Sequence, residues 1–302
     1  MGGVVMHDDE LEISVDVATR LVATQFPEHD GLPVVRVGSH GTVHAVFRIG
    51  DSVSARFPLR ADDPTIVRAA LEHEAASARE LASAVAVDVP EPLAIGAPGE
   101  GYPLPWSLHR WLPGATATEH DPGHSVGFAL DLVELVGQIS AIPLQGRSFR
   151  GSGRGGDLRD HDWWMRACFD RSTHLLPVDR LRATWAHLRP LPRRDPDRIT
   201  HGDLVPGNLV VHDDRLAGLL DVGGLGAADP AVDLVVAWHV LHDEPRAVFR
   251  ERLAVDDLGW QRGMAWAFQQ AMGLVWYYET SNPTMSAIGR RTLERILATP
   301  FT

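Results

Sequence analysis

The stretch His201-Gly202-Asp203-Leu204-Val205-Pro206-Gly207-Asn208 precedes the apolar run 209–211, and a further carboxylate, Asp221, comes directly after Leu219-Leu220. A hydroxyl that attacks the terminal phosphate of a nucleotide needs a carboxylate to orient it and accept its proton, and Asp203 is the candidate. Magnesium takes oxygen ligands, so Asn208 and Asp221 are the candidate metal ligands. The stretch therefore predicts a site for phosphoryl transfer.

The local pattern also predicts how these groups come together. Pro206 and Gly207 indicate a turn between the base and the amide. The apolar residues 209–211 predict a short buried strand, and residues 215–220 predict its partner. Such a hairpin would return Asp221 to the side of the amide.

Together these features resemble the aminoglycoside phosphotransferase family, whose members are small-molecule kinases. The shared pattern is HGD, four residues and N, then a short hairpin ending in Asp, and then Asp229-Pro230-Ala231-Val232-Asp233-Leu234. Where the family usually has Asp-Phe-Gly, this chain has Asp221-Val222-Gly223, which keeps the middle position apolar.

The resemblance implies an α+β, bilobal protein-kinase-like fold. Residues 1–108 would form a β-rich, nucleotide-binding N-lobe, and residues 109–302 a mainly helical C-lobe that contains the catalytic loop and the acceptor site. The cofactors implied are ATP, with GTP as an alternative, and Mg²⁺. The reaction implied is transfer of the γ-phosphate to a hydroxyl of a small molecule, with an aminoglycoside antibiotic as the leading acceptor and antibiotic resistance as the role. A macrolide or a metabolite alcohol is the alternative acceptor.

Two further residues have roles that the resemblance implies. His201 matches a structural histidine that hydrogen-bonds near the metal-binding Asp, and Asp233 matches a carboxylate that supports the catalytic-loop backbone. Asp229 has a simpler interpretation, because Asp followed by Pro is typical of a helix N-terminus.

On the nucleotide side, the family places a cation on the third strand and pairs it with a helix carboxylate. The chain contains no lysine, and Arg56 occupies the position where the family has Lys or, in some branches, Arg. Arginine can bind phosphate and hold a carboxylate through two hydrogen bonds. We expect Glu74 as its partner, with Glu72, on a different helix face, as the alternative.

The phosphates and the base need further contacts. The loop 38–42, with Ser39 and His40, matches the family's phosphate cover in position, and a plain hairpin turn is the alternative interpretation. The backbone of residues 106–111, including Leu108 and Arg110, is expected to face adenine. Trp106 and Trp111 are interpreted as packing residues rather than as stacking partners of the base.

The acceptor site is expected near Asp203 in the helical lobe. Carboxylates bind ammonium groups and aromatic faces suit sugar rings, although aromatic residues at helical spacing also form cores. Two candidate walls combine these residue types: Asp157, Asp160 and Asp162 with Trp163 and Trp164, and Trp260, Trp266, Trp276, Tyr277 and Tyr278 with Glu279.

Composition limits the partners. The 302 residues include 28 basic and 40 acidic side chains, a net charge of -12, which argues against nucleic acid and favours a cationic acceptor. Ordinary solubility charge is the alternative explanation. The single cysteine, Cys168, excludes an internal disulfide and favours the cytoplasm. No apolar run is long enough to cross a membrane and no export signal is evident, and we expect a monomer or homodimer.

A catalytically silent nucleotide-binding protein is the alternative from another functional class. Arg56 in place of lysine and valine after Asp221 favour it, whereas the intact base and metal ligands oppose it. His239 and His242 are interpreted as a structural pair three residues apart on one helix, since no HExxH or GxSxG motif occurs.

The pattern predicts the following elements. Strands are expected near 32–37, 42–49, 52–57, 91–97 and 104–110. Helices are expected near 14–26, 64–84, 124–142, 157–170, 178–189, 229–242, 245–254, 257–280 and 284–297.

Overall fold

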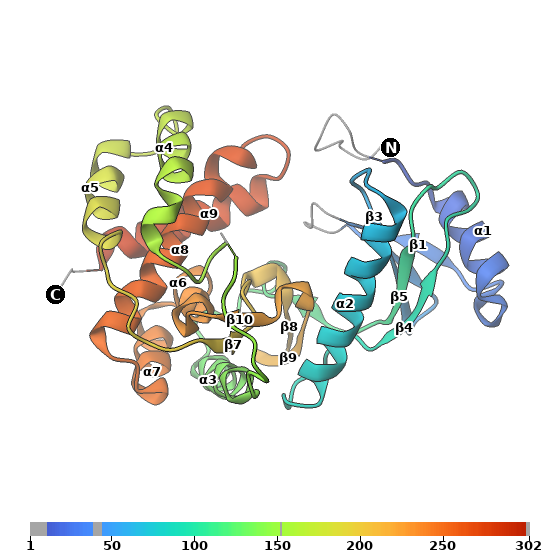
Figure 1. The fold of residues 1–302 in the computed structure, drawn as a ribbon, viewed down its shortest axis with the longest axis horizontal. Coiled ribbons are helices and arrows are strands. Elements are labelled where there is room, and N and C mark those ends of the chain that lie inside the picture. Colours follow the sequence, from blue (N-terminus) through green and yellow to red (C-terminus); the bar gives the residue numbers. More distant parts are fainter. Residues whose placement is uncertain (1–10, 39–43, 152, 300–302) are drawn as a thin grey trace. The chain divides into compact units, whose positions relative to one another are not determined.

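The computed structural model describes residues 11–38, 44–151 and 153–299, so Ser39 and His40 lie outside the described residues (Figure 1). The chain forms two compact units. The first comprises the described residues up to Ser83 together with Asp88–Pro113, and the second comprises Ala84–Val87 and the described residues from Gly114 onward. The boundary predicted after residue 108 falls inside a strand that ends at Arg110, so the first unit extends beyond it.

The first unit contains one antiparallel sheet with the strand order β1-β2-β3-β5-β4. Its two helices begin at residues suited to that position: Ser14 accepts a hydrogen bond from the N–H of Val17, and Asp63 accepts one from the N–H of Thr65. The elements are α1 (Val15–Gln25), β1 (Val34–Arg36), β2 (His44–Ile49), β3 (Val53–Pro58), α2 (Pro64–Ala82), β4 (Pro92–Gly96) and β5 (Trp106–Arg110).

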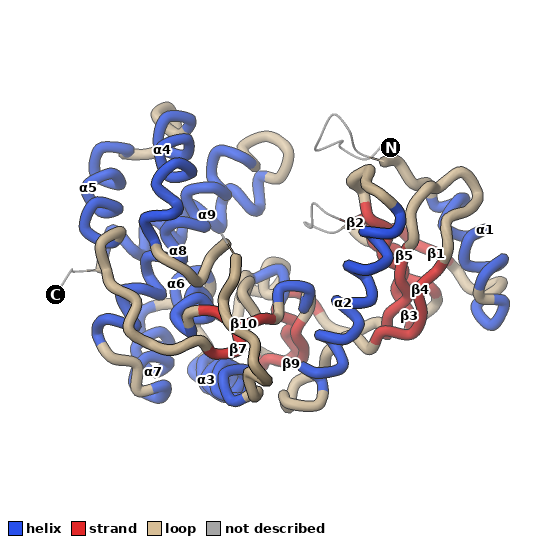
Figure 2. Tube along the Cα trace, viewed as in Figure 1, coloured by secondary structure: helices blue, strands red, loops and turns tan. Residues whose placement is uncertain are grey.

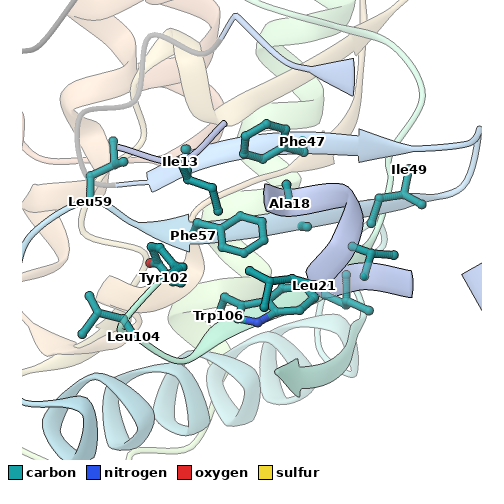
Figure 3. Packing of buried hydrophobic residues seen from close by; sticks show 14 of the residues in the cluster. Ile13, Ala18, Leu21, Phe47, Ile49, Phe57, Leu59, Tyr102, Leu104 and Trp106 are labelled. Atoms are coloured by element: carbon teal, nitrogen blue, oxygen red, sulfur yellow. The ribbon is translucent and has the colours of Figure 1, made fainter. Parts of the chain in front are cut away.

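Aromatic rings fill the core of this unit (Figure 3). Phe57 stacks on Trp106 with ring centroids 4.7 Å apart, and Phe47 meets Phe57 edge to face. The indole N–H of Trp106 donates to the carbonyl of Ala97, and a Cβ at Gly96 would lie 2.3 Å from the indole. Trp106 is therefore a core residue of the sheet and cannot stack on a base.

The second unit is mainly helical, with two small antiparallel sheets ordered β6-β8-β9 and β10-β7 (Figure 2). Most of α8 is buried, and it packs against α4, α5 and α9. The elements are β6 (Ala115–Thr116), α3 (Val126–Ala141), α4 (Asp162–Arg171), α5 (Val178–Leu188), β7 (Arg198–Thr200), β8 (Leu209–His212), β9 (Arg215–Leu219), β10 (Gly226–Ala228), α6 (Val236–His239), α7 (Asp243–Leu253), α8 (Asp257–Tyr277) and α9 (Pro283–Ala298). No described helix combines the length and apolar character needed to span a membrane.

Two predicted helices differ from the structure. The segment predicted at 229–242 forms a 3₁₀ helix, Pro230–Val235, followed by the single turn of α6, and His242 lies beyond that turn. The segment is rich in valine, and the β-branched side chain of valine makes a long α-helix less favourable. The helix predicted at 157–170 likewise begins as a 3₁₀ helix, Leu158–His161. For the other predicted helices and strands, the predicted first and last residues lie within about three residues of those observed in the described parts of the chain.

A buried ion pair fixes the backbone around the catalytic segment. Arg262 on α8 donates from Nε to Asp229 Oδ2 at 2.7 Å, and it also donates to the carbonyls of Leu191 and Gly156. Both charged side chains are almost fully buried. Removing one member of such a pair leaves an unpaired buried charge, which typically costs about 3–5 kcal/mol. Arg262 thus fastens three chain segments to α8.

Candidate active site

The hairpin β8–β9 brings the candidate metal ligands together. The N–H of Leu220 donates to the carbonyl of Asn208 at 2.8 Å, so Asp221 follows directly after a residue bonded to Asn208. A 3₁₀ turn, Pro206–Asn208, precedes the hairpin at the place where the sequence predicted a turn. The strands of this hairpin are largely buried, so the ligands lie where the hairpin enters and leaves the core.

The carboxylate of Asp203 has two unlike oxygen atoms. Oδ1 accepts from Arg154 Nη2 at 2.8 Å and from Gln270 Nε2 at 2.7 Å. Oδ2 accepts from Asn208 Nδ2 at the longer distance of 3.2 Å. The side chain is 37% exposed, so it is reachable from solvent. Two donors therefore orient one oxygen, while the other has only a weak partner and can accept a proton.

Asn208 and Asp221 fit a magnesium ion by their chemistry. Asn208 Nδ2 donates to the carbonyl and to Oδ2 of Asp203, which leaves the amide oxygen of Asn208 as the atom for a hard cation. Asp221 is exposed and has a left-handed backbone, with φ 55°. Asp and Asn enter this region far more readily than other residues with a side chain, and non-glycine residues there cluster at functional sites.

A buried carboxylate shapes the catalytic loop. Asp233, 2% exposed, accepts from the N–H of His201 at 2.8 Å and from the N–H of Gly202 at 2.9 Å. Burial raises the pKa of Asp233, and His201 together with these two donors opposes that rise. Gly202 has φ 83°, a conformation that favours glycine. One side chain thus sets the direction in which the loop leaves β7.

His201 has backbone partners on both ring nitrogens. Nε2 donates to the carbonyl of Leu220 at 3.1 Å, and Nδ1 accepts from the N–H of Asp203 at 3.3 Å. The ring is fully buried. His201 therefore links the loop that contains Asp203 to the end of the hairpin. Both ring nitrogens are used in these backbone bonds, which is the geometry of a structural residue and not of a base.

Sequence reasoning missed the two strongest partners of Asp203. Arg154 comes from the Gly-rich segment 151–156 and also donates to the carbonyl of Gly202 at 2.9 Å. Gln270 lies on α8, which is otherwise mainly apolar. A lone arginine in a Gly-rich segment and the polar pair Gln269-Gln270 in a buried helix were the available signals.

In the first unit, Arg56 on β3 forms an ion pair with Glu74 on α2, whereas Glu72 is exposed. Both paired side chains are mostly buried. His44 and His109 lie close to the guanidinium, and burial together with the charge of Arg56 lowers the pKa of each to about 3. These rings are neutral at pH 7 and add no positive charge beside Arg56.

The residues predicted to face adenine have partners within the sheet. Leu108 is buried in β5 between Ala55 of β3 and Ala94 of β4. The N–H of Arg110 donates to the carbonyl of Glu91, and the side chains of the same two residues form an ion pair. The N–H of Trp111 donates to Ser52. Because sheet neighbours use the N–H groups of Arg110 and Trp111, neither can donate to a base.

The two candidate acceptor walls meet, but only in part. Trp164 lies between Trp163 and Trp276, with ring centroids 5.9 Å and 5.8 Å away, and Trp163 is 69% exposed. Trp260 and Trp266 are buried core residues, so they do not belong to a wall.

Three of the four carboxylates in these walls have an arginine or histidine partner. Asp157 pairs with Arg159 at 2.7 Å, and this hydrogen bond lowers the pKa of Asp157. Glu279 lies 3.2 Å from His174. Asp162 pairs with Arg189, while Asp160 is exposed.

Sequence comparisons match this chain to known phosphotransferases. The family model described as the phosphotransferase enzyme family (APH) matches residues 34–266. An aminoglycoside 3'-phosphotransferase of Escherichia coli is 35% identical over 145 residues, which are 45% of this chain and 52% of the relative. One of Salmonella typhimurium is 35% identical over 74 residues, 24% of this chain and 26% of the relative. The chain thus spans about half the length, or less, of these curated relatives.

Solved structures share the fold at low identity. The GDP complex of aminoglycoside 2'-phosphotransferase-IIIa has a TM-score of 0.70 at 19% identity, covering 96% of this chain and 100% of that one. A macrolide 2'-phosphotransferase from Brachybacterium faecium has a TM-score of 0.58 at 20% identity, covering 95% and 99%. The predicted α+β, protein-kinase-like fold is confirmed.

The neutral histidines around Arg56 predict an acid-sensitive first unit. Burial holds the pKa of His109 in the folded protein at about 3, below its ordinary value of 6.5, so the unfolded chain binds more protons between these two pH values. The contribution of His109 to the free energy of unfolding is therefore complete above pH 6.5. Between pH 6.5 and the folded pKa it falls by about 1.4 kcal/mol for each pH unit of acidification. Urea unfolding at pH 6.5 and pH 4.5 should therefore show a smaller loss in His109→Gln than in the parent protein. Equal losses in both proteins would contradict the assignment.

Proposed function

This chain belongs to the phosphotransferase enzyme family, and we propose that it transfers the γ-phosphate of ATP, or alternatively of GTP, to a hydroxyl of a small molecule. The observation that carries the proposal is the arrangement of Asp203. Two donors fix its Oδ1, and Asn208 lies beside it at the start of the hairpin that ends in Asp221. A base next to two oxygen ligands for magnesium is the arrangement that phosphoryl transfer needs.

The proposed reaction follows from these positions. Oδ2 of Asp203 orients the acceptor hydroxyl and receives its proton as the acceptor oxygen bonds to the γ-phosphorus. The bond from that phosphorus to the bridging oxygen breaks, and the nucleoside diphosphate leaves with the electron pair. Magnesium bound by Asn208 and Asp221 would neutralise charge on the phosphate oxygens. Arg154 keeps Oδ1 occupied, so Asp203 presents a single oxygen to the acceptor.

Arg56 is proposed as the phosphate-binding cation of the nucleotide site. Its ion pair with Glu74 supports this role, because the carboxylate orients a guanidinium that is 19% exposed. The pair also weakens the silent-protein alternative, since arginine occupies the lysine position with the helix carboxylate in place. Val222, 4% exposed, keeps the residue after Asp221 in an apolar setting.

We propose an aminoglycoside as the acceptor and the cytoplasm as the location. The Escherichia coli and Salmonella typhimurium relatives are aminoglycoside phosphotransferases, and the chain carries a net charge of -12. The paired carboxylates of the candidate walls contribute less attraction than unpaired ones would. A macrolide is the second candidate, favoured by the exposed ring of Trp163 and by the shared fold of a macrolide 2'-phosphotransferase.

The first test concerns the base. Asp203→Asn keeps the shape of the side chain and removes its charge, so kcat should fall by about 10²- to 10⁴-fold while nucleotide affinity stays nearly constant. Asp213→Asn, at an exposed position in the turn between β8 and β9, is the matched control and should keep full activity. A loss below about threefold in Asp203→Asn would remove Asp203 from this role.

The second test separates metal binding from loop support. Asp221→Asn suits the left-handed backbone, so the protein should fold normally, but loss of the ligand's negative charge should weaken magnesium-dependent nucleotide binding in calorimetric titrations. Asp214→Asn, with φ 55° in the same hairpin, is the control and should bind normally. Asp233→Ala should instead lower the free energy of unfolding by about 1–3 kcal/mol, because two buried N–H groups lose their acceptor. Normal magnesium-nucleotide binding by Asp221→Asn would defeat the assignment.

The third test concerns the acceptor class. Raising ionic strength from 0.01 M to 0.15 M shortens the Debye length from about 30 Å to about 8 Å. The Michaelis constant for a polyamine sugar should therefore rise clearly, while that for a neutral macrolide should hardly change. A salt-independent constant for the sugar, or a neutral compound as the best acceptor, would overturn the cationic assignment and leave phosphoryl transfer intact.

A further inference from the structure

A line of hydrogen bonds leads from Asp203 into the helical core. Gln270 Nε2 donates to Asp203 Oδ1 at 2.7 Å, and Gln270 Oε1 lies 3.1 Å from His239 Nε2. His239 Nδ1 lies 2.9 Å from Thr292 Oγ1. The chain therefore joins the candidate base to α8, α6 and α9 in turn.

Two residues of this hydrogen-bond series, His239 and Thr292, are buried away from solvent. His239 is 2% exposed and Thr292 is fully buried. Burial lowers the pKa of His239 to about 4, so the ring is neutral at pH 7 and carries one N–H. Each bond in the chain must then be assigned from the donors and acceptors that these side chains possess.

Because Asp203 is a carboxylate, it determines which atom donates and which accepts in every hydrogen bond of this series. A carboxylate only accepts, so Gln270 must turn its amide nitrogen toward Asp203 and its oxygen toward His239. His239 must therefore carry its proton on Nε2, which leaves a lone pair on Nδ1. The hydroxyl oxygen of Thr292 lies 2.9 Å from both His239 Nδ1 and the carbonyl oxygen of Ile288, and in this arrangement the hydroxyl proton must point toward Nδ1.

We propose that the Thr292–His239–Gln270 chain is a positioning relay that orients the catalytic base. It rests on the proposed function of Asp203. The donors point in one direction, from Thr292 through His239 and Gln270 to Oδ1. With Oδ1 occupied by Gln270 and Arg154, Oδ2 is the oxygen that faces the acceptor hydroxyl and takes its proton.

None of the three residues needs to touch substrate for this role. Thr292 is separated from Asp203 by two side chains, and its hydroxyl acts only through His239. Loss of the hydroxyl lets the imidazole and then the amide shift, and a small displacement of a reacting group lowers turnover without changing how substrates bind.

The first arm of the test is kinetic and uses isosteric changes. Thr292→Val should lower kcat by about three- to tenfold with both Michaelis constants within about twofold of the parent, and Gln270→Leu should lower kcat by about 10- to 100-fold. Thr292→Ser restores the hydroxyl and should restore kcat to within about twofold. Thr184→Val is the matched control, because Thr184 is also buried and its hydroxyl donates only to the carbonyl of Arg180.

The second arm does not depend on activity. Imidazole nitrogen chemical shifts at pH 7, assigned with a His239→Gln variant, should show the Nε2–H form of His239 in the parent protein. Gln270→Leu removes the carbonyl partner of Nε2 and should convert His239 to the Nδ1–H form, which can donate to Thr292.

The two arms separate the relay from the proposed reaction. Equal kcat values for Thr292→Val and Thr184→Val, or an Nδ1–H form of His239 in the parent protein, would overturn the relay while leaving phosphoryl transfer in place. Absence of phosphoryl transfer to every acceptor tested would overturn the proposed reaction and the relay's part in it. The nitrogen spectra would then still report whether the hydrogen-bond chain exists.

Discussion

The carboxylate of Asp233 is the constraint on which the second unit's geometry depends. Two consecutive N–H groups, from His201 and Gly202, converge on its two oxygens in a buried site. That convergence requires the left-handed backbone of Gly202, and it fixes the direction of the next residue, Asp203. The ion pair of Arg262 and Asp229 then anchors the segment that carries Asp233. Burial of an unpaired carboxylate is unfavourable, so these two N–H donors favour the observed conformation of the loop.

Most of the fold follows from local signals in the sequence. The apolar period of 3.6 residues predicts α1, because its buried residues Ala18, Leu21 and Val22 recur on one face of the helix. The segment at 229–242 was predicted wrongly for a physical reason. Its apolar residues resemble a helical pattern, but valine favours a long α-helix only weakly, and Asp233 within the 3₁₀ helix also bonds two N–H groups about 30 residues back in the chain. Such a tertiary requirement leaves no trace in periodicity.

The candidate site divides in the same way. Asp203, Asn208 and Asp221 lie within one short stretch, and the spacing that joins them is written in the sequence. Gln270 and Arg154 contact Asp203 across 67 and 49 residues, and neither belongs to a motif. The ion pairs of the wall carboxylates could not be predicted for a similar reason, since the partner of Asp162 is Arg189, 27 residues away. The sequence states which charges exist, whereas packing decides which of them remain unpaired.

The left-handed backbone at Asp221 has an evolutionary consequence. Glycine and asparagine adopt this conformation as easily as aspartate, and a single-base change converts an aspartate codon to either. Most loss-of-function changes in an enzyme also impair folding, and cells then degrade the product. At this position the two effects separate. With Asp221 as the proposed metal ligand, a stable, abundant protein that still presents its acceptor surface but binds the metal poorly is one nucleotide away, so gene duplicates of this chain have a short route to becoming binding proteins.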